Sequence, residues 1–313
     1  MTVSRRDFLA ASLATGAVAS TQSELAADTP RPPQPQFSYC FNTSTIRGQK
    51  LKLVDEIEIV AKAGYTGIEP WMREIETYVK DGGSMQDLKK RLDDHGLQVE
   101  SAIGFAQWIV DDDEKRKAGL EQAKHDMDLL AQIGGTHIAA PPVGAHRGSG
   151  PVDLFKAAER YRALLEVGAK IGVIPQVEVW GFSDNLSRLG ESIFVAIEAG
   201  HPQACLLPDV YHIFKGGSDF AGLGMVAGSG IHCFHVNDYP ADPPRDTIGD
   251  KDRVYPGDGI APLNDILQTI AANGCKAALS LELFNPGYWE QDAFEVAKTG
   301  LEKTKDAVAK AFS

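Results

Sequence analysis

Four side chains able to bind a metal ion or move a proton end four strand-like segments in the second half of the chain. They are Glu178, Asp209, His235 and Glu282, and roughly one strand–helix unit separates each from the next. Three carboxylates and one imidazole suit a hard or borderline divalent cation such as Mn²⁺, Mg²⁺, Co²⁺ or Zn²⁺. Without a cation, three carboxylates in one site would repel one another strongly. The pattern therefore predicts one divalent metal ion held by these four residues.

Each of the four residues taken alone has an ordinary structural explanation. A glutamate at the end of a strand, such as Glu178 or Glu282, is more often a solvated or ion-paired loop residue. Asp209 could cap the helix that follows it, and His235 could be a structural residue. Because all four end consecutive strands, a shared site is favoured over four separate explanations.

Eight apolar strand-like segments alternate with helical segments. The strands are expected at 37–41, 65–69, 97–103, 136–140, 173–178, 205–209, 231–235 and 277–282. Strands that are almost continuously apolar are typical of a parallel sheet covered on both faces. Eight strand–helix units in about 280 residues predict a single-domain α/β fold, the (β/α)₈ TIM barrel. A doubly wound open sheet is the alternative, but it usually has a glycine-rich turn after the first strand, and residues 42–46 are not glycine-rich.

The helices that would position the strand ends follow from apolar spacing and from capping residues. They are expected at 51–63, 85–95 after a Ser84 cap, 113–133, 151–171, 187–199, 261–272 and 289–310. The segment 216–229 is rich in glycine and only weakly helical, and 237–259 is a long polar loop. In a barrel of this kind the active site lies at the C-terminal ends of the strands, where the four candidate ligands are expected.

Residues 1–35 read as a targeting segment and linker that precede a catalytic domain at 36–313. Ser4-Arg5-Arg6-Asp7-Phe8-Leu9 is followed by a mildly apolar stretch and resembles a twin-arginine export signal. Cleavage after Ala19 or near Ala27 is left open. Because this route carries folded proteins, it suits a chain that takes up its metal before export. The expected location is the periplasm or another extracytoplasmic space.

Composition excludes two classes of partner. The net charge of −12 and the pI of about 5.1 argue against a nucleic-acid backbone, which needs clustered Lys and Arg. No apolar run reaches the roughly 18 residues that a membrane-spanning helix needs. The four cysteines (Cys40, Cys205, Cys233 and Cys275) are expected to be buried free thiols, although an oxidising destination would permit a disulfide.

At these motifs the chain resembles a known family. Glu178, Asp209-Val-Tyr-His212, His235-Val-Asn-Asp238 and Glu282 are similar to motifs of the xylose-isomerase-like TIM-barrel superfamily of sugar isomerases and epimerases. The nearest pattern is that of the ketose 3-epimerases, and the resemblance covers about residues 36–310. It implies that Glu178, Asp209, His235 and Glu282 bind one divalent metal, and that the two glutamates act as acid and base.

The same resemblance implies two substrate contacts. His212 would contact a substrate oxygen, and Arg253, which precedes Pro256-Gly-Asp-Gly259, would contact the tail of the sugar. The segment after Glu178 and the 237–259 loop depart from the ketose epimerase pattern, so no particular sugar is implied.

Several other residues near strand ends have two interpretations. Trp180, two residues after Glu178 and so on the same side of an extended segment, is the best candidate to stack on a sugar face. Glu69 is either a solvated acid, the commoner case, or a support for a metal ligand. The other aromatic candidates either stack on substrate or pack in the core; they are Trp71, Trp108, Phe284 and Trp289.

These observations lead us to expect a metal-dependent sugar isomerase or epimerase that works through a cis-enediolate. The partner would be a small sugar or keto-sugar, and a homodimer or tetramer is left open. A lyase or dehydratase on the same scaffold is the first alternative, because removal of the same proton leads to elimination when a β-leaving group is present. Two others are an endonuclease IV-like phosphodiesterase, which the negative charge disfavours, and a sugar-binding protein without turnover.

Overall fold

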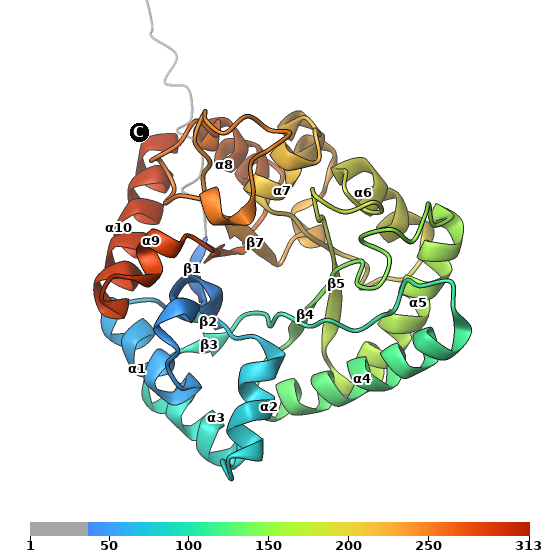
Figure 1. The fold of residues 1–313 in the computed structure, drawn as a ribbon, viewed down its shortest axis with the longest axis horizontal. Coiled ribbons are helices and arrows are strands. Elements are labelled where there is room, and N and C mark those ends of the chain that lie inside the picture. The colour runs from blue at the N-terminus through green and yellow to red at the C-terminus, as the bar shows by residue number, and fades with distance from the viewer. Residues whose placement is uncertain (1–36) are drawn as a thin grey trace, which may run out of the picture. The chain divides into compact units, whose positions relative to one another are not determined.

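The computed structural model describes residues 37–313, so the predicted signal and linker lie outside the described residues. The described part is a ring of eight parallel strands surrounded by helices (Figure 1). The strands are β1 (Ser38–Asn42), β2 (Gly67–Glu69), β3 (Gln98–Val99), β4 (His137–Ala140), β5 (Ile174–Glu178), β6 (Leu206–Leu207), β7 (Cys233–Val236) and β8 (Ala278–Leu281). This arrangement confirms the predicted single-domain (β/α)₈ barrel.

The strands pair in chain order around the ring. Two sheets, with strand orders β3-β2-β1-β8-β7 and β4-β5-β6, account for most of the pairing. The junction between β3 and β4 is closed by Ala102, whose carbonyl accepts a hydrogen bond from Ala139 N at 2.8 Å. The junction between β6 and β7 is closed by His235 N, which donates to Pro208 O at 2.9 Å, and by parallel bridges such as the one between Asp209 and His235. Asp209 and His235 are therefore neighbours in register at the same edge of the barrel.

The longer helices form the outer layer of the barrel (Figure 1). They are α1 (Leu53–Ala63), α2 (Met72–Lys80), α3 (Met85–Asp94), α4 (Asp113–Gln132), α5 (Leu154–Ile171), α6 (Leu189–Glu198), α8 (Leu263–Ala272) and α10 (Ala293–Ala311). Four short helices follow strands: η1 (Thr43–Gln49), α7 (Val210–Lys215), η4 (Asp250–Asp252) and α9 (Pro286–Trp289). Two more, η2 (Phe220–Met225) and η3 (Gly228–Gly230), lie between α7 and β7.

Local signals placed most of these boundaries well. Ser84 accepts a hydrogen bond from Asp87 N and starts α3, and Gly64 ends α1 with a positive φ of 95°. The helices α2 and α7 were not predicted, because both follow strand ends directly with no separating loop. The strands β3 and β6 are shorter than expected, at two residues each.

All four cysteines are buried and free, which confirms that expectation. None of the helices in the described part of the chain is both long and apolar enough to cross a membrane.

Candidate metal and substrate site

The four candidate ligands gather at the C-terminal end of the barrel. Glu178 is the last residue of β5, and His235 lies within β7. Asp209 caps α7 directly after β6, and Glu282 follows β8. None of the four residues is more than 3 % exposed. The alternative that Glu178 and Glu282 are solvated loop acids is therefore wrong. Asp209 does cap a helix, since its Oδ1 accepts a hydrogen bond from His212 N at 2.7 Å.

Three of the four residues form a compact group. Asp209, His235 and Glu282 each offer one ligand atom, and these atoms lie within 4.8 Å of one another. The Nδ1 atom of His235 is 3.3 Å from Glu282 Oε2 and 3.6 Å from Asp209 Oδ2, and it has no hydrogen-bond partner. One imidazole nitrogen and two carboxylate oxygens form a donor set that a borderline divalent cation prefers.

Glu69 holds His235 in the orientation that this group requires. Its Oε2 atom lies 3.0 Å from His235 Nε2 and accepts hydrogen bonds from Ser280 Oγ at 2.7 Å and Asn42 Nδ2 at 2.8 Å. Burial alone would raise the pKa of Glu69, but His235 and these two donors lower it to about 2. A carboxylate behind a histidine fixes the ring and its tautomer, so that the other nitrogen faces the metal.

The solvated interpretation of Glu69 is therefore wrong, because the side chain is fully buried. The residues that support it, Asn42 and Ser280, were not predicted as part of the site. Asn42 also donates to Glu282 Oε1 at 3.3 Å and accepts from Trp71 Nε1 at 3.0 Å. The only sequence signal was that Asn42, like the acids, stands at a strand end.

Arg253 neutralises the carboxylates of the group. Its Nη1 donates to Glu282 Oε2 at 2.8 Å and to Asp209 Oδ2 at 3.0 Å. Its Nη2 donates to Asp250 Oδ1 and lies 3.0 Å from His212 Nε2. Burial would raise the pKa of Asp209, but the Arg253 charge holds it well below the ordinary range. The guanidinium thus bonds the same two carboxylate oxygens that face His235.

His235 completes this charge balance. Burial would lower its pKa, but Glu282 and Glu69 raise it well above the ordinary value. The imidazole therefore carries a proton in this arrangement. Binding of a cation would release that proton, because a metal ligand must be a neutral imidazole.

Glu178 lies apart from the compact group and has a different protonation state. Its Oε2 atom is buried without a hydrogen-bond partner. Burial raises the pKa of Glu178 to about 8; His235 opposes this rise, and Glu282 adds to it. At neutral pH Glu178 therefore holds a proton, whereas Asp209 is ionised. A buried acid that keeps its proton near neutral pH is suited to deliver that proton to a substrate.

A cavity of about 410 Å³ opens above these groups. Glu178, His212, Arg253 and Glu282 line it, and so does Trp180, as predicted for that residue. The other walls are mostly aromatic, formed by Trp71, Phe105, Phe182, Phe284 and Trp289. Of the five aromatic candidates, only Trp108 is elsewhere; it is fully buried and donates to Pro141 O at 2.9 Å. This volume and this mixture of apolar walls with few polar groups are typical of a small-molecule site.

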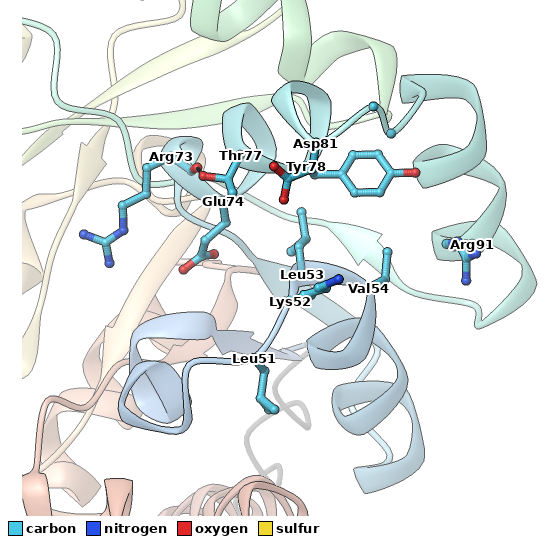
Figure 2. Close-up of a pocket in the computed structure, with 12 residues that line it drawn as sticks. Leu51, Lys52, Leu53, Val54, Arg73, Glu74, Thr77, Tyr78, Asp81 and Arg91 are labelled. Carbon is cyan, nitrogen blue, oxygen red and sulfur yellow. Dashed lines mark hydrogen bonds between the residues drawn. The ribbon is translucent and has the colours of Figure 1, made fainter.

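A second cavity of about 510 Å³ lies between α1, α2 and α3 (Figure 2). Arg73 and Arg91 lie at opposite ends of it, with Glu74 and Tyr78 between them (Figure 2). Glu74 is already occupied, since its Oε2 accepts from Thr43 Oγ1 at 2.7 Å and from Trp71 N at 3.0 Å. The residues lining this cavity include none of the grouped metal-binding side chains, so we assign the chemistry to the smaller one.

Comparison with known proteins supports the same fold. The chain is 27 % identical over 277 residues to an inosose isomerase of Bacillus velezensis, covering 87 % of this chain and 98 % of that protein. It is 24 % identical over 238 residues to a 3-dehydroshikimate dehydratase of Pseudomonas aeruginosa, covering 75 % of this chain but 37 % of that protein. The match to the inosose isomerase thus covers more of this chain and more of the relative than the match to the dehydratase. The sequence pattern had instead suggested the ketose 3-epimerases.

Solved structures agree in fold. A crystal structure of the IolI protein with a bound zinc atom superimposes with a TM-score of 0.82 at 24 % identity, covering 88 % of this chain and all of that one. A D-psicose 3-epimerase superimposes with a TM-score of 0.71 at 18 % identity, covering 87 % of this chain and 99 % of that one. Both likenesses show the fold alone. The family model described as the xylose isomerase-like TIM barrel matches residues 57–307, and the chain therefore belongs to that family.

Proposed function

We propose that this protein is a metal-dependent isomerase that acts on a polyhydroxylated ketone, with an inosose-like ring as the nearest substrate class. The observation that carries the proposal is the buried group of Asp209, His235 and Glu282 beside a protonated Glu178 at the end of the barrel. The inosose isomerases among the relatives, which match over nearly their whole length, support the reaction class.

Asp209, His235 and Glu282 would hold the divalent ion. Glu178 would either be the fourth ligand or lie close to the ion without binding it. The unpartnered His235 Nδ1 is the observation in favour of this assignment. When bound, such an ion supplies Lewis-acid stabilisation of negative charge on a substrate oxygen. The zinc atom in the IolI structure makes Zn²⁺ the first ion to test.

Glu282 and Glu178 would share the proton transfer. Glu282 removes the proton from the carbon beside the ketone, which produces an enediolate. Glu178, which holds a proton at neutral pH, would deliver its own proton to the former carbonyl carbon, while the hydroxyl proton of the first carbon passes to the former carbonyl oxygen. Delivery to the neighbouring carbon moves the carbonyl and gives isomerisation, whereas return to the opposite face of the first carbon gives epimerisation.

Arg253 and His212 would bind substrate oxygens at the floor of the cavity. Burial, followed by the Arg253 charge, lowers the pKa of His212, so the imidazole is neutral at working pH. A neutral imidazole next to a guanidinium can donate or accept a hydrogen bond without adding charge. Trp180 would cover one face of the ring.

Metal content is the first test. Elemental analysis of protein purified without chelator should find about one divalent ion per wild-type chain. His235→Ala should lose most of it. No ion in the wild type, even after reconstitution, would end the proposal, and three ions per chain would indicate the phosphodiesterase alternative.

Isotope exchange is the second test. Incubation with inosose in deuterated water should place deuterium on the carbons next to the ketone, read by mass spectrometry and NMR. Release of water from the substrate would indicate a dehydratase instead, the reaction class named for the second set of relatives. Binding of inosose without any exchange would indicate a sugar-binding protein.

We also propose that the chain is exported. The support is the Arg5-Arg6 pair with Phe8 and Leu9, which is a sequence argument alone. Fractionation of cells that express the full chain should find the protein outside the cytoplasm. Replacing both arginines with lysine should retain it inside, and an unchanged distribution would contradict the proposal.

A further inference from the structure

Arg47 is held over aromatic rings and has no hydrogen-bond acceptor among residues 37–313. Its guanidinium carbon lies 5.1 Å from the ring centroids of Phe284 and Trp289 and 5.3 Å from that of Trp71. No carboxylate of the described residues comes within the 4.0 Å of an ion pair. The side chain lines the same cavity as Glu178 and Glu282. Aromatic faces attract the cation but leave its five N–H donors unused.

The position of Arg47 is fixed by docking of η1 on α9. Trp289 Nε1 donates to Ser44 O at 3.1 Å, and Gln49 Nε2 donates to Tyr288 O at 3.0 Å. Gly48 makes the close approach feasible, because a Cβ atom there would collide with Trp289. The guanidinium is therefore positioned before any ligand arrives, which lowers the entropic cost of binding to it.

The other two cations that line the cavity already have carboxylate partners. Arg253 bonds Asp209, Glu282 and Asp250, and Lys251 pairs with Asp252 at 2.7 Å. Among neighbouring charges, the one that affects the pKa of Arg47 most is another cation, Arg73. Burial lowers the pKa of Arg47 and Arg73 lowers it further, while Glu282 and Glu74 raise it.

Arg73 is a second cation next to Trp71, although it lines the second cavity and not this one. Its guanidinium lies 4.2 Å from the Trp71 ring, and it has no ion-pair partner within residues 37–313. A chain of net charge −12 thus leaves one guanidinium, that of Arg47, unpaired at the wall of its candidate active site, and a second, that of Arg73, unpaired next to the same tryptophan. A protein with an excess of acids can readily pair exposed arginines, so unpaired ones beside a cavity suggest a ligand anion.

We propose that the substrate of this site carries a carboxylate that Arg47 binds, on a hydroxylated six-membered ring that also holds the reacting ketone. This inference rests on the proposed function and deepens it. Planar guanidinium and carboxylate groups match in a two-bond geometry, which lysine cannot reproduce. The ring would lie among Trp71, Phe284 and Trp289, with its anionic group towards Arg47 and its ketone towards Glu178 and Glu282.

The test compares the affinities of two ligands that differ in whether they carry a carboxylate charge. Shikimate and its methyl ester share a hydroxylated six-membered ring and differ in the carboxylate charge, and neither holds a ketone, so both can bind without turnover. Calorimetric titration of zinc-loaded protein should show the acid binding at least about tenfold more tightly than the ester, which corresponds to about 1.4 kcal/mol. Equal affinities, or no binding of either compound at millimolar concentration, would overturn the inference.

Matched variants locate the effect. Arg47→Gln should bring the two affinities together, and Arg47→Lys should give an intermediate ratio. Lys251→Gln removes the same charge from a paired residue of the same cavity and should keep most of the preference. If Lys251→Gln abolished it as fully as Arg47→Gln, general electrostatics rather than Arg47 would be responsible.

Two readouts keep this result separate from the proposed function. Unchanged zinc content and an unchanged midpoint of thermal unfolding in Arg47→Gln would show that the variant folds. Isotope exchange on neutral inosose without any preference for the acid would overturn only the carboxylate subsite. A preference for the acid without exchange on any ketone would instead overturn the isomerase proposal and leave the anion subsite standing.

Discussion

Arg253 and Arg47 line one cavity but are stabilised in opposite ways. Arg253, at the floor, is fully buried and bonds three carboxylates and approaches a histidine. Arg47, at the wall, is half-buried against three aromatic rings without an acid. The floor therefore balances its own charges, whereas the wall leaves a positive charge for a ligand. Under the two proposals above, the floor would hold the reacting groups and the wall would select the substrate.

The largest expected effect is at the floor, on turnover. Glu282→Gln should lower the isotope-exchange rate by about 10²–10⁴-fold, because the proposed base is lost while its shape is kept. It should also reduce metal content, since Glu282 belongs to the compact group. Glu178→Gln should lower the rate similarly but keep more of the metal. Near-normal exchange in Glu282→Gln would refute the two-glutamate mechanism.

The second effect compares the two arginines directly. Arg253→Met should lower the unfolding free energy of metal-free protein by about 3–5 kcal/mol, because Asp209 and Glu282 lose a buried partner. Zn²⁺ should recover much of this loss by pairing with the same carboxylates. Arg47→Met, with no acid partner, should cost far less. Denaturant titration with and without Zn²⁺ measures both, and equal losses would break the comparison.

A smaller effect, on metal affinity, is expected at Glu69, which lies behind the metal-binding group. Glu69→Gln should weaken metal affinity by about 10–100-fold, because His235 loses the carboxylate that orients its ring. Competition with a chromophoric chelator measures this affinity. Glu100→Gln is the control, a partly buried acid that accepts from Ser38 and lies outside the metal-binding groups. An equal loss in both variants would mean that Glu69 acts only through general charge.

The smallest effect concerns Glu56, a buried acid that forms no ion pair with any of residues 37–313. Burial, and then Glu74, raise the pKa of Glu56 to about 9. Because the folded pKa lies above the unfolded one, wild-type stability falls as pH rises from about 4.5 towards 9. Glu56→Gln should therefore raise the unfolding midpoint by a few degrees at pH 8 and change it little at pH 4. The exposed Glu58→Gln on the same helix should show no such dependence, and a matching one would refute this account.

The sequence predicted the barrel and the strand-end residues because both depend on local pattern. Apolar runs and helix stops located the strands, and strands in a parallel barrel bring their ends to one edge. What Glu69 does could not be predicted in this way. Its state depends on His235 and Ser280, which are distant in the chain, and an acid between isoleucine and proline looks the same in sequence whether solvated or buried.

The arginines illustrate the same limit. Resemblance to the family assigned Arg253 to the substrate tail, which stays a prediction; what the sequence did not indicate is that its guanidinium bonds Asp209 and Glu282. Arg47 stands in a segment noted only for lacking a glycine-rich turn. Its meaning comes from Trp289, which lies more than two hundred residues later and approaches through the gap left at Gly48. Contacts of this kind have no local signature.

The fastening of η1 to α9 has a consequence for synthesis. Thr45 Oγ1 donates to Leu281 O and accepts from Leu283 N, so the first βα loop and the last one complete each other. A nascent chain that has not yet reached Glu282 and Trp289 has neither the third ligand of the metal group nor the aromatic support for Arg47. The site thus cannot be assembled piecewise as the ribosome advances. A product truncated before Glu282 would carry no half-active pocket, and ion loading would report that synthesis had passed the last strand.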